Sequence, residues 1–356
     1  MLRPGLSGIM RVKNDAEFIE ASIDSCIDAL DELVIVYNGC TDHSPQLILQ
    51  KQQQYPDKIK VYEYEPLVVA NNLTEKEYQK ALKLPDDSPH LLCNYYNFAL
   101  SKATYAYAIK IDADQIYMRD QLLYWCNICH QKEKKQVSLK VLLGKCFHYY
   151  FLLYRFLGIK FGKQLPMIPE RLSRFIEPYY REYAVHSFLQ GKSAISLSGI
   201  NVVYDTSWNV PLGGVNSIMN ILPPYNGEGD HLIFKISELT FYRRYSMPYY
   251  NLLRSASFSL IEEFVHPYKV MYMGFAWFHL NAMRSMYRDQ VVRLKKDMPH
   301  KYVPLTEFLE LSYSAVKKKA DFQMHRLYQR LLFSYLHNAS ITGVKKYVGM
   351  LNQVIK

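Results

Sequence analysis

The chain has 356 residues and a formal net charge of +10 at pH 7; 49% of its residues are hydrophobic and 21% are charged. This composition is typical of a globular protein with a full core and argues against an intrinsically disordered chain. The positive charge favours an anionic partner, such as nucleotide phosphates or an acidic membrane surface. We expect no nucleic-acid partner, because the basic residues are spread out and no reader motif occurs.

The sequence also bears on the cellular location. No apolar run follows the N-terminus, so we expect no secretory signal. The most apolar stretch, residues 147–159, is short for a membrane span and contains His148 and Arg155. We therefore expect a cytoplasmic protein that is at most peripheral on the cytosolic face of the inner membrane. Cys126 and Cys129 have zinc-site spacing but no second pair, so we interpret them as core thiols.

The first part of the chain alternates between strand-like and helix-like segments. Residues 8–13 predict a strand, and Asn14 with Glu17 predicts a helix that begins with a capping box. Residues 33–37 form an apolar run typical of a buried parallel strand, and after another helix residues 59–64 alternate like a strand. This order predicts an α/β fold with a doubly wound, mostly parallel sheet flanked by helices.

A pair of carboxylates follows the next predicted strand. Residues 65–92 interrupt the alternation with a helix between two loops, and a helix at 94–103 leads into a strand at 106–111. That strand ends at Asp112 and Asp114, and open α/β sheets bind ligands at such carboxyl ends. The two carboxylates can hold a divalent cation that also bridges a diphosphate, because hard cations take oxygen ligands. The alternative is an ordinary turn, in which Asp is common.

Four motifs occur in an order that carries a resemblance: Asn14, residues 37–42, Tyr96-Asn97 and Asp112-Ala113-Asp114. Over residues 8–117 the chain resembles glycosyltransferase family 2 and its relatives with the GT-A fold. The resemblance implies a GT-A-like sheet, a nucleotide-diphosphate-sugar donor and Mn²⁺ or Mg²⁺ as cofactor. In that family acidic residues follow the second strand and one of them reads the nucleotide base. Tyr37 and Asn38 stand there in this chain, which leaves the nucleotide open.

The resemblance also implies a set of site residues. It assigns nucleotide-sugar binding to Arg11, Asn14, Asn38, Asn97, Lys110, Asp112, Gly199 and Asn201. A glycine such as Gly199 lets the backbone approach a ligand closely, although it can equally mark a bulge. The metal ligands would be Asp112, Asp114 and His279, with His266 as the competing histidine. Residues 211–214 form a candidate lid loop over the donor.

A second acidic cluster lies at residues 226–231, ahead of the apolar run 232–234, as expected for a loop that enters a helix. Its placement resembles the motif that supplies the general base of inverting GT-A enzymes, although a helix N-terminus rich in acidic residues is the alternative. We assign the base to Asp230, because partial burial near the apolar run would raise its pKa. Glu228 would orient the acceptor. The next candidates for the base are Glu170, Glu177 and Asp205.

Two basic regions complete the chain. Residues 137–163 combine lysines and an arginine with many aromatic and aliphatic residues, which fits either a membrane-facing segment or an ordinary packed helix pair. Residues 286–356 predict a basic helical region after a catalytic domain that spans residues 1–285. Its charges fit docking to a membrane or a partner, and they equally fit a solvated helix face.

The combined hypothesis is a metal-dependent, inverting glycosyltransferase. It would move a sugar from a nucleotide-diphosphate donor to a glycan or glycolipid acceptor of lipopolysaccharide or capsule type. One rival is a sugar-phosphate nucleotidyltransferase, but residues 10–14 lack the glycine-rich phosphate loop that it needs. The other is a non-catalytic membrane-associated scaffold, which the carboxylates at Asp112, Asp114 and Asp230 argue against.

Overall fold

The computed structural model describes residues 2–70, 73–132, 136–162, 168–213, 221–245, 249–251, 257–260, 262–320 and 327–355. The chain divides into two compact units. Unit 1 comprises residues 1–113 and 233–268, and unit 2 comprises residues 114–232 and 269–356. The chain therefore passes from unit 1 to unit 2 between Ala113 and Asp114, within the acidic motif.

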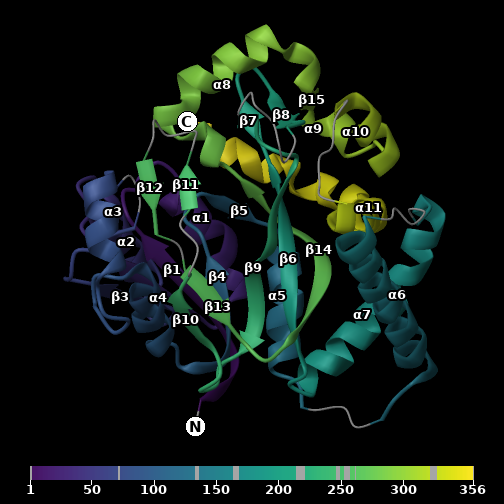
Figure 1. The fold of residues 1–356 in the computed structure, drawn as a ribbon, viewed down its shortest axis with the longest axis horizontal. Coiled ribbons are helices and arrows are strands. Elements are labelled where there is room, and N and C mark those ends of the chain that lie inside the picture. Colours follow the sequence, from purple (N-terminus) through teal and green to yellow (C-terminus); the bar gives the residue numbers. More distant parts are fainter. Residues whose placement is uncertain are drawn as a thin grey trace. The chain divides into compact units, whose positions relative to one another are not determined.

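Unit 1 contains a parallel sheet whose strands run in the order β3-β2-β1-β4 (Figure 1). The C-terminal end of β9 pairs antiparallel with β4, with Ala108 opposite Phe234. The buried apolar runs of β1 and β2 explain the arrangement, since a strand covered on both faces favours parallel pairing. The strand bounds are β1 (Arg3–Val12), β2 (Glu32–Tyr37), β3 (Ile59–Glu63), β4 (Tyr105–Ile111) and β9 (Tyr225–Lys235).

Helices and short strand pairs complete unit 1. The pairs β10 with β13 and β11 with β12 are antiparallel. The bounds are α1 (Ile19–Cys26), η1 (Ile27–Ala29), α2 (Ser44–Gln54), α3 (Glu75–Leu82), α4 (Leu92–Ser101), β10 (Phe241–Arg244), β11 (Tyr249–Asn251), β12 (Ser257–Ser259) and β13 (Glu262–Val265).

The capping box predicted at Asn14 and Glu17 is wrong. Helix α1 begins five residues after Asn14 and has Phe18 at its N-cap, without a side-chain hydrogen bond. Asn14 instead adopts a positive φ of 59°, a conformation that asparagine tolerates better than most residues. A capping box does occur at α3, where Thr74 and Glu77 bond each other's backbone N–H groups.

Unit 2 contains strands in the order β9-β6-β14-β5. Figure 1 shows β9, β6 and β14 side by side. Strands β6 and β14 are parallel, and β5 pairs antiparallel with the end of β14. A small sheet in the order β15-β8-β7 lies in the same unit. The bounds are β5 (Gln115–Tyr117), β6 (Ser193–Asn201), β7 (Val203–Tyr204), β8 (Trp208–Pro211), β14 (Lys269–His279) and β15 (Tyr302–Pro304).

The helices of unit 2 include two long ones, α6 and α7, which pack side by side and against α11 (Figure 1). None of the helices within the described residues is both long and apolar enough to cross a membrane. The bounds are α5 (Arg119–Cys129), α6 (Leu139–Phe161), α7 (Glu170–Leu189), η2 (Asn281–Met283), α8 (Ser285–Asp297), η3 (Pro299–Lys301), α9 (Leu305–Phe308), α10 (Tyr313–Ala320), α11 (Leu327–Ser340) and η4 (Ile341–Gln353).

Two expectations about segments of unit 2 have clear outcomes. Residues 226–231 do not form a loop that enters a helix, because they lie within β9. Cys126 and Cys129 are buried thiols on α5 that form no disulfide, as predicted. The general prediction of an α/β fold with a mostly parallel sheet, flanking helices and C-terminal helices is confirmed.

Candidate functional site

Asp114 lies at the start of unit 2, immediately before β5. Its side chain is only 10% exposed, and its Oδ2 accepts hydrogen bonds from Arg284 Nη2 at 3.0 Å and Nε at 3.3 Å. The Nε2 atom of His279 is 3.7 Å from the same oxygen. The sheet creates this proximity, because β5 pairs with β14 so that Gln115 is opposite His279. The predicted metal ligands Asp114 and His279 are therefore brought together.

Asn201 fixes the orientation of His279. The two residues are partners in the β6–β14 register, and His279 Nδ1 is 2.7 Å from Asn201 Oδ1. The Asn201 amide nitrogen donates to the Pro223 carbonyl at 2.7 Å, so its oxygen is the group that faces the histidine. An amide oxygen can only accept, so His279 Nδ1 carries the proton. Nε2 is then the ring nitrogen that faces Asp114.

This donor set fits a divalent cation. A carboxylate oxygen and a neutral imidazole nitrogen are ligands that Mn²⁺ accepts, and a hydrogen bond on the other ring nitrogen is the usual support for a ligating histidine. Arg284 is itself a cation, and its guanidinium bonds Asp114 Oδ2, the carboxylate oxygen that faces His279. Asp114 thus faces one permanent positive charge, and a metal ion would have to share its carboxylate with that charge.

Arg284 is the site residue that the sequence did not reveal. It stands at the N-cap position of α8, directly after η2. Nothing in its local sequence marks it, because its partner Asp114 is 170 residues away along the chain. Only the return of β14 beside β5 brings the two together.

A separate charged cluster lies in unit 1 at the end of β4. Lys110 Nζ is 3.5 Å from Asp112 Oδ2, and Lys110 lines a small pocket together with Arg11 and Tyr96. The Arg11 guanidinium lies over the Tyr96 ring, 2.9 Å from its centroid. The Ser22 hydroxyl donates to the Asp112 carbonyl and holds the end of the strand. The structure therefore gathers three of the predicted donor-binding residues, two of them cationic.

Asn38 has a structural role in this fold. The side chain is 1% exposed, and its amide nitrogen donates to the carbonyls of Tyr64 at 2.5 Å and Pro66 at 2.8 Å. Its oxygen accepts from Val68 N at 3.3 Å. The two donated bonds commit both amide hydrogens to the Tyr64 and Pro66 carbonyls, so the side chain cannot also donate to a nucleotide base.

Asn97 and Asn14 likewise bond protein groups. Asn97 exchanges two hydrogen bonds with the backbone of Tyr242, at 2.7 and 2.8 Å, and so ties α4 to β10. Asn14 exchanges two with Thr41, at 2.7 and 3.1 Å, and so joins the loops that follow β1 and β2. Asn14 therefore lies at the carboxyl end of the unit 1 sheet, where β1 and β2 end.

Gly199 makes room for an aromatic side chain. A Cβ at this position would overlap the indole ring of Trp277, which is fully buried. The indole Nε1 donates to Asn226 Oδ1 at 2.9 Å. The close approach that the sequence predicted at Gly199 is therefore made to Trp277, within the protein core.

The two predicted catalytic carboxylates lie on β9, and the side chains of Glu228 and Asp230 are outside the described part of the structure. The backbone around them is unusual. Gly227 and Gly229 have φ angles of 83° and 78°, values that favour glycine because it has no Cβ. Gly229 N also donates to Ser196 Oγ at 3.2 Å. Glycine at both positions therefore lets the strand pass through residues 226–231 without strain at these φ angles.

The remaining candidates are dispersed. In unit 1, His266 accepts from the backbone N–H of Tyr268 at 3.2 Å. In unit 2, Glu170 and Glu177 pair with arginines one turn along α7, and Asp205 pairs with Lys295 at 2.6 Å. The Lys295 pair and nearby backbone N–H groups outweigh the effect of burial and lower the pKa of Asp205 to about 2, which makes it a poor proton acceptor.

Of the candidate lid loop at residues 211–214, Gly214 lies outside the described residues. Gly213 N donates to the Leu222 carbonyl at 2.7 Å, and a Cβ on Gly213 would overlap the Ile221 carbonyl. This part of the loop is therefore packed against the chain that leads into β9.

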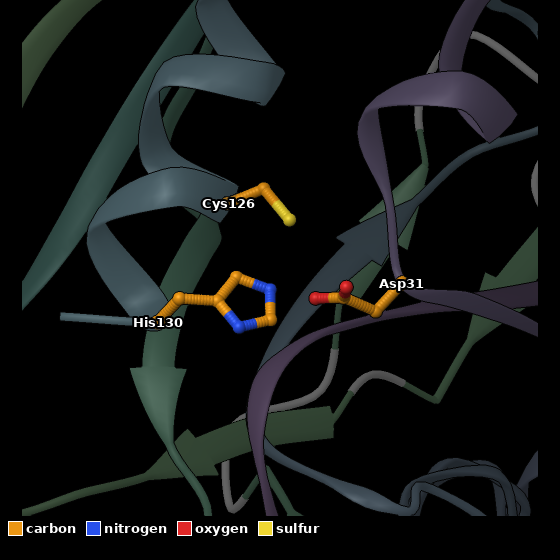
Figure 2. A group of neighbouring side chains, drawn as sticks. All are labelled: Asp31, Cys126 and His130. Atoms are coloured by element: carbon orange, nitrogen blue, oxygen red, sulfur yellow. The ribbon is translucent and has the colours of Figure 1, made fainter.

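Figure 2 shows Cys126 and His130 on the same side of α5, one helical turn apart. The sulfur and a ring nitrogen are within 4.8 Å of each other. Asp31, also labelled there, belongs to unit 1 and accepts a hydrogen bond from Leu6 N at 2.8 Å. Two ligands are fewer than the four of a structural zinc site, and we assign Cys126 and His130 no metal role.

Comparison with known proteins finds a family model that is similar to the first part of the chain. Residues 5–156 match the family model described as beta-1,4-N-acetylgalactosaminyltransferase (CgtA). The match includes β1 to β4, Asp112 and Asp114, and it ends within α6. It covers less than half of the chain and excludes Asn201, His279 and Arg284. No curated protein matches the chain.

Solved structures of glucosyl-3-phosphoglycerate synthase from Mycobacterium tuberculosis show a partial likeness. The complex with Mn²⁺, uridine-diphosphate and phosphoglyceric acid is 18% identical, covers 32% of this chain and 34% of that chain, and has a TM-score of 0.21. The complex with Mg²⁺ and uridine-diphosphate has the same values. The chain thus spans about a third of the length of these relatives.

Proposed function

We propose that this chain, a glycosyltransferase with a GT-A fold, transfers a sugar from a nucleotide-diphosphate donor to a glycan or glycolipid acceptor by an inverting, metal-dependent reaction. The observation that carries the proposal is the placement of Asp114 beside His279, whose tautomer is fixed by Asn201. This arrangement favours catalysis over the rival hypothesis of a non-catalytic scaffold. Lipopolysaccharide or capsule is the proposed acceptor class.

Asp114 and His279 would hold Mn²⁺ or Mg²⁺ in unit 2. Once bound, the metal would neutralise the diphosphate leaving group as its negative charge develops. In unit 1 the two cations Arg11 and Lys110 line the small pocket beside Asp112 and would attract a phosphate group. A role for Asp112 as a metal ligand stays a prediction, as does the division into a catalytic domain of residues 1–285 and a helical region of residues 286–356.

The acceptor hydroxyl must lose its proton as it attacks the sugar, so an inverting reaction needs a base. Asp230 is the proposed base, and Glu228 would orient the acceptor. Asp230→Asn should lower kcat by roughly 10² or more, the usual scale for losing a general base, while donor affinity is kept. Glu228→Gln should mainly raise the KM for the acceptor. An exchange of these phenotypes would move the base to Glu228.

The decisive experiment measures hydrolysis of a panel of nucleotide sugars with Mn²⁺ and with a chelator. We expect turnover with at least one donor in the presence of the metal and none with the chelator. Asp114→Asn should abolish turnover and metal-dependent donor binding while circular dichroism shows an intact fold. Asp297→Asn, at the C-terminal end of α8, is the matched control and should behave like the wild type. Full activity of Asp114→Asn would refute the metal site.

A further inference from the structure

The surface of α6 is unusual for a protein that faces water. The helix has 23 residues without a single Asp or Glu, and it carries Lys140, Lys145, Arg155 and Lys160. Ten large apolar side chains of α6 are more than a third exposed, and α7 adds Leu172 and Phe175. Those on α6 are Leu139, Leu142, Leu143, Tyr149, Tyr150, Leu152, Leu153, Phe156, Ile159 and Phe161. Apolar area of this extent marks an interaction site. The basic residues and the lack of acidic ones favour an anionic partner for this site.

A cavity of about 240 Å³ opens beneath this helix, between α6, α7, β14 and α11. Phe151 and Val270 contribute apolar walls, and Arg155 and Lys269 are the two permanent cations in its lining. Pockets for whole drug-sized ligands have volumes of roughly 300–1,000 Å³. This cavity therefore fits part of a flexible molecule, such as one end of an acyl chain.

His148 also lines the cavity and is only 3% exposed. Neither of its ring nitrogens has a hydrogen-bond partner within the described part of the chain. A buried polar group without a partner costs about 1–3 kcal/mol, so it calls for an explanation. Burial, with the nearby charge of Lys269, lowers the pKa of His148 to about 4. The ring is therefore neutral at pH 7 and has an N–H to donate to a ligand oxygen.

We propose that this cavity binds an anionic lipid of the bilayer on which α6 lies, with an acyl chain against Phe151 and Val270 and the headgroup phosphate at Arg155, Lys269 and His148. A bare phosphate would leave the apolar walls without a partner, and a neutral chain would leave the cations and His148 unused. The inference goes beyond sugar transfer and rests on the membrane-facing interpretation of residues 137–163, not on the donor chemistry. It gives the protein a lipid site away from the Asp114 site.

The test uses the full chain and lysophosphatidic acid with one 16-carbon chain, below the concentration at which it forms micelles. Monopalmitoylglycerol supplies the chain without the charge, and glycerol 3-phosphate supplies the charge without the chain. A ligand that binds only the folded state raises the thermal midpoint, which reports affinity. We expect lysophosphatidic acid to bind at least tenfold more tightly than either control compound. Equal stabilisation by monopalmitoylglycerol, or none by lysophosphatidic acid, would overturn the proposal.

Variants separate the cavity from the outer surface. Lys269→Gln should weaken the binding of lysophosphatidic acid at least tenfold. The matched control is Lys160→Gln, which lies outside the cavity lining and should bind the lipid like the wild type. Val270→Phe should fill the cavity and abolish binding. If Val270→Phe does not fold, Lys269→Gln decides alone, and unchanged binding by it refutes the site. Nucleotide-sugar hydrolysis should stay intact in Lys269→Gln, so failure of the donor chemistry and failure of the lipid site remain distinguishable.

Discussion

Arg284 places a permanent positive charge on the carboxylate that is proposed to hold the metal. Arg284→Gln should tighten Mn²⁺ binding by about tenfold, because removing one nearby cation changes the binding energy by roughly 1.4 kcal/mol at the high effective dielectric of a partly exposed site. Electron paramagnetic resonance of free Mn²⁺ measures this affinity without any turnover. Arg288→Gln, one turn further along α8, is the control and should leave the affinity unchanged. Weaker Mn²⁺ binding in Arg284→Gln would mean that the arginine supports the metal site.

The indole ring of Trp277 packs directly against the backbone of Gly199 in the core of unit 2. Gly199→Ala should lower the free energy of unfolding by about 1–3 kcal/mol, because the new Cβ overlaps the buried indole and overpacks the core. Urea denaturation followed by circular dichroism measures the change. Gly343→Ala is the control, since no heavy atom lies within 4 Å of its added Cβ. If both variants unfold at the same urea concentration, the indole has moved aside without cost.

At the scale of single residues, the sequence singled out Asp114, Asn201 and His279, which the structure brings together, and Asn38 and Asn97, whose amides bond backbone groups. To predict that the first three lie together, only the strands had to be predicted correctly, because the register between neighbouring strands brings these residues together. The two asparagines bond backbone groups in distant loops. Side-chain chemistry is the same for a loop carbonyl and a nucleotide base, so the residue type alone could not separate the two roles.

Among the elements, α11 carries a buried histidine whose charge state is linked to stability. The pKa of His337 is lowered to about 4 by burial. Its Nε2 lies 2.6 Å from the Leu311 carbonyl, and its Nδ1 lies 2.8 Å from the Tyr225 hydroxyl. Because a carbonyl only accepts, Nε2 carries the proton and Nδ1 accepts from the tyrosine.

The free energy of unfolding should therefore depend on pH through His337. The pKa in the folded state lies below the ordinary value, so the unfolded chain takes up the proton first as the pH falls. This stability is complete above pH about 6.5 and decreases toward pH 4 by up to about 3 kcal/mol. Urea denaturation at several pH values measures it. His337→Gln should be less stable at pH 7.5 but lose less stability toward pH 4, and parallel pH curves for the two proteins would contradict the assignment.

The elements themselves were largely predictable, and β9 is the instructive exception. Strands β1 to β4 and the helices between them have strong local patterns, so their order could be predicted from the sequence. Residues 226–231 contain Asn, two glycines and two acids, which locally favour a turn. Their strand conformation comes from pairing with β6 and from the positive φ of Gly227 and Gly229, which only the tertiary structure reveals.

For the whole molecule, the net charge of +10 and the exposed apolar face of α6 predict binding to anionic vesicles. The protein should sediment with vesicles that contain phosphatidylglycerol, and salt should weaken the binding because it screens exposed charges. The double variant Leu153→Ser and Phe156→Ser should reduce sedimentation several-fold, since both side chains are about half exposed. Leu239→Ser, which removes an equally exposed apolar residue from unit 1, is the control. Equal binding to uncharged vesicles would rule out an electrostatic contribution to membrane binding.

The face of α6 has a further consequence for the protein in lipid-free buffer. Apolar surface without a bilayer reduces its contact with water by meeting another copy of itself. Light scattering in such a buffer should therefore show a mass that rises with protein concentration and returns to the monomer when lipid nanodiscs are added. An oligomeric state measured without lipid would then describe the self-associated protein in buffer. Only the state measured on nanodiscs would describe the protein when it is bound to lipid.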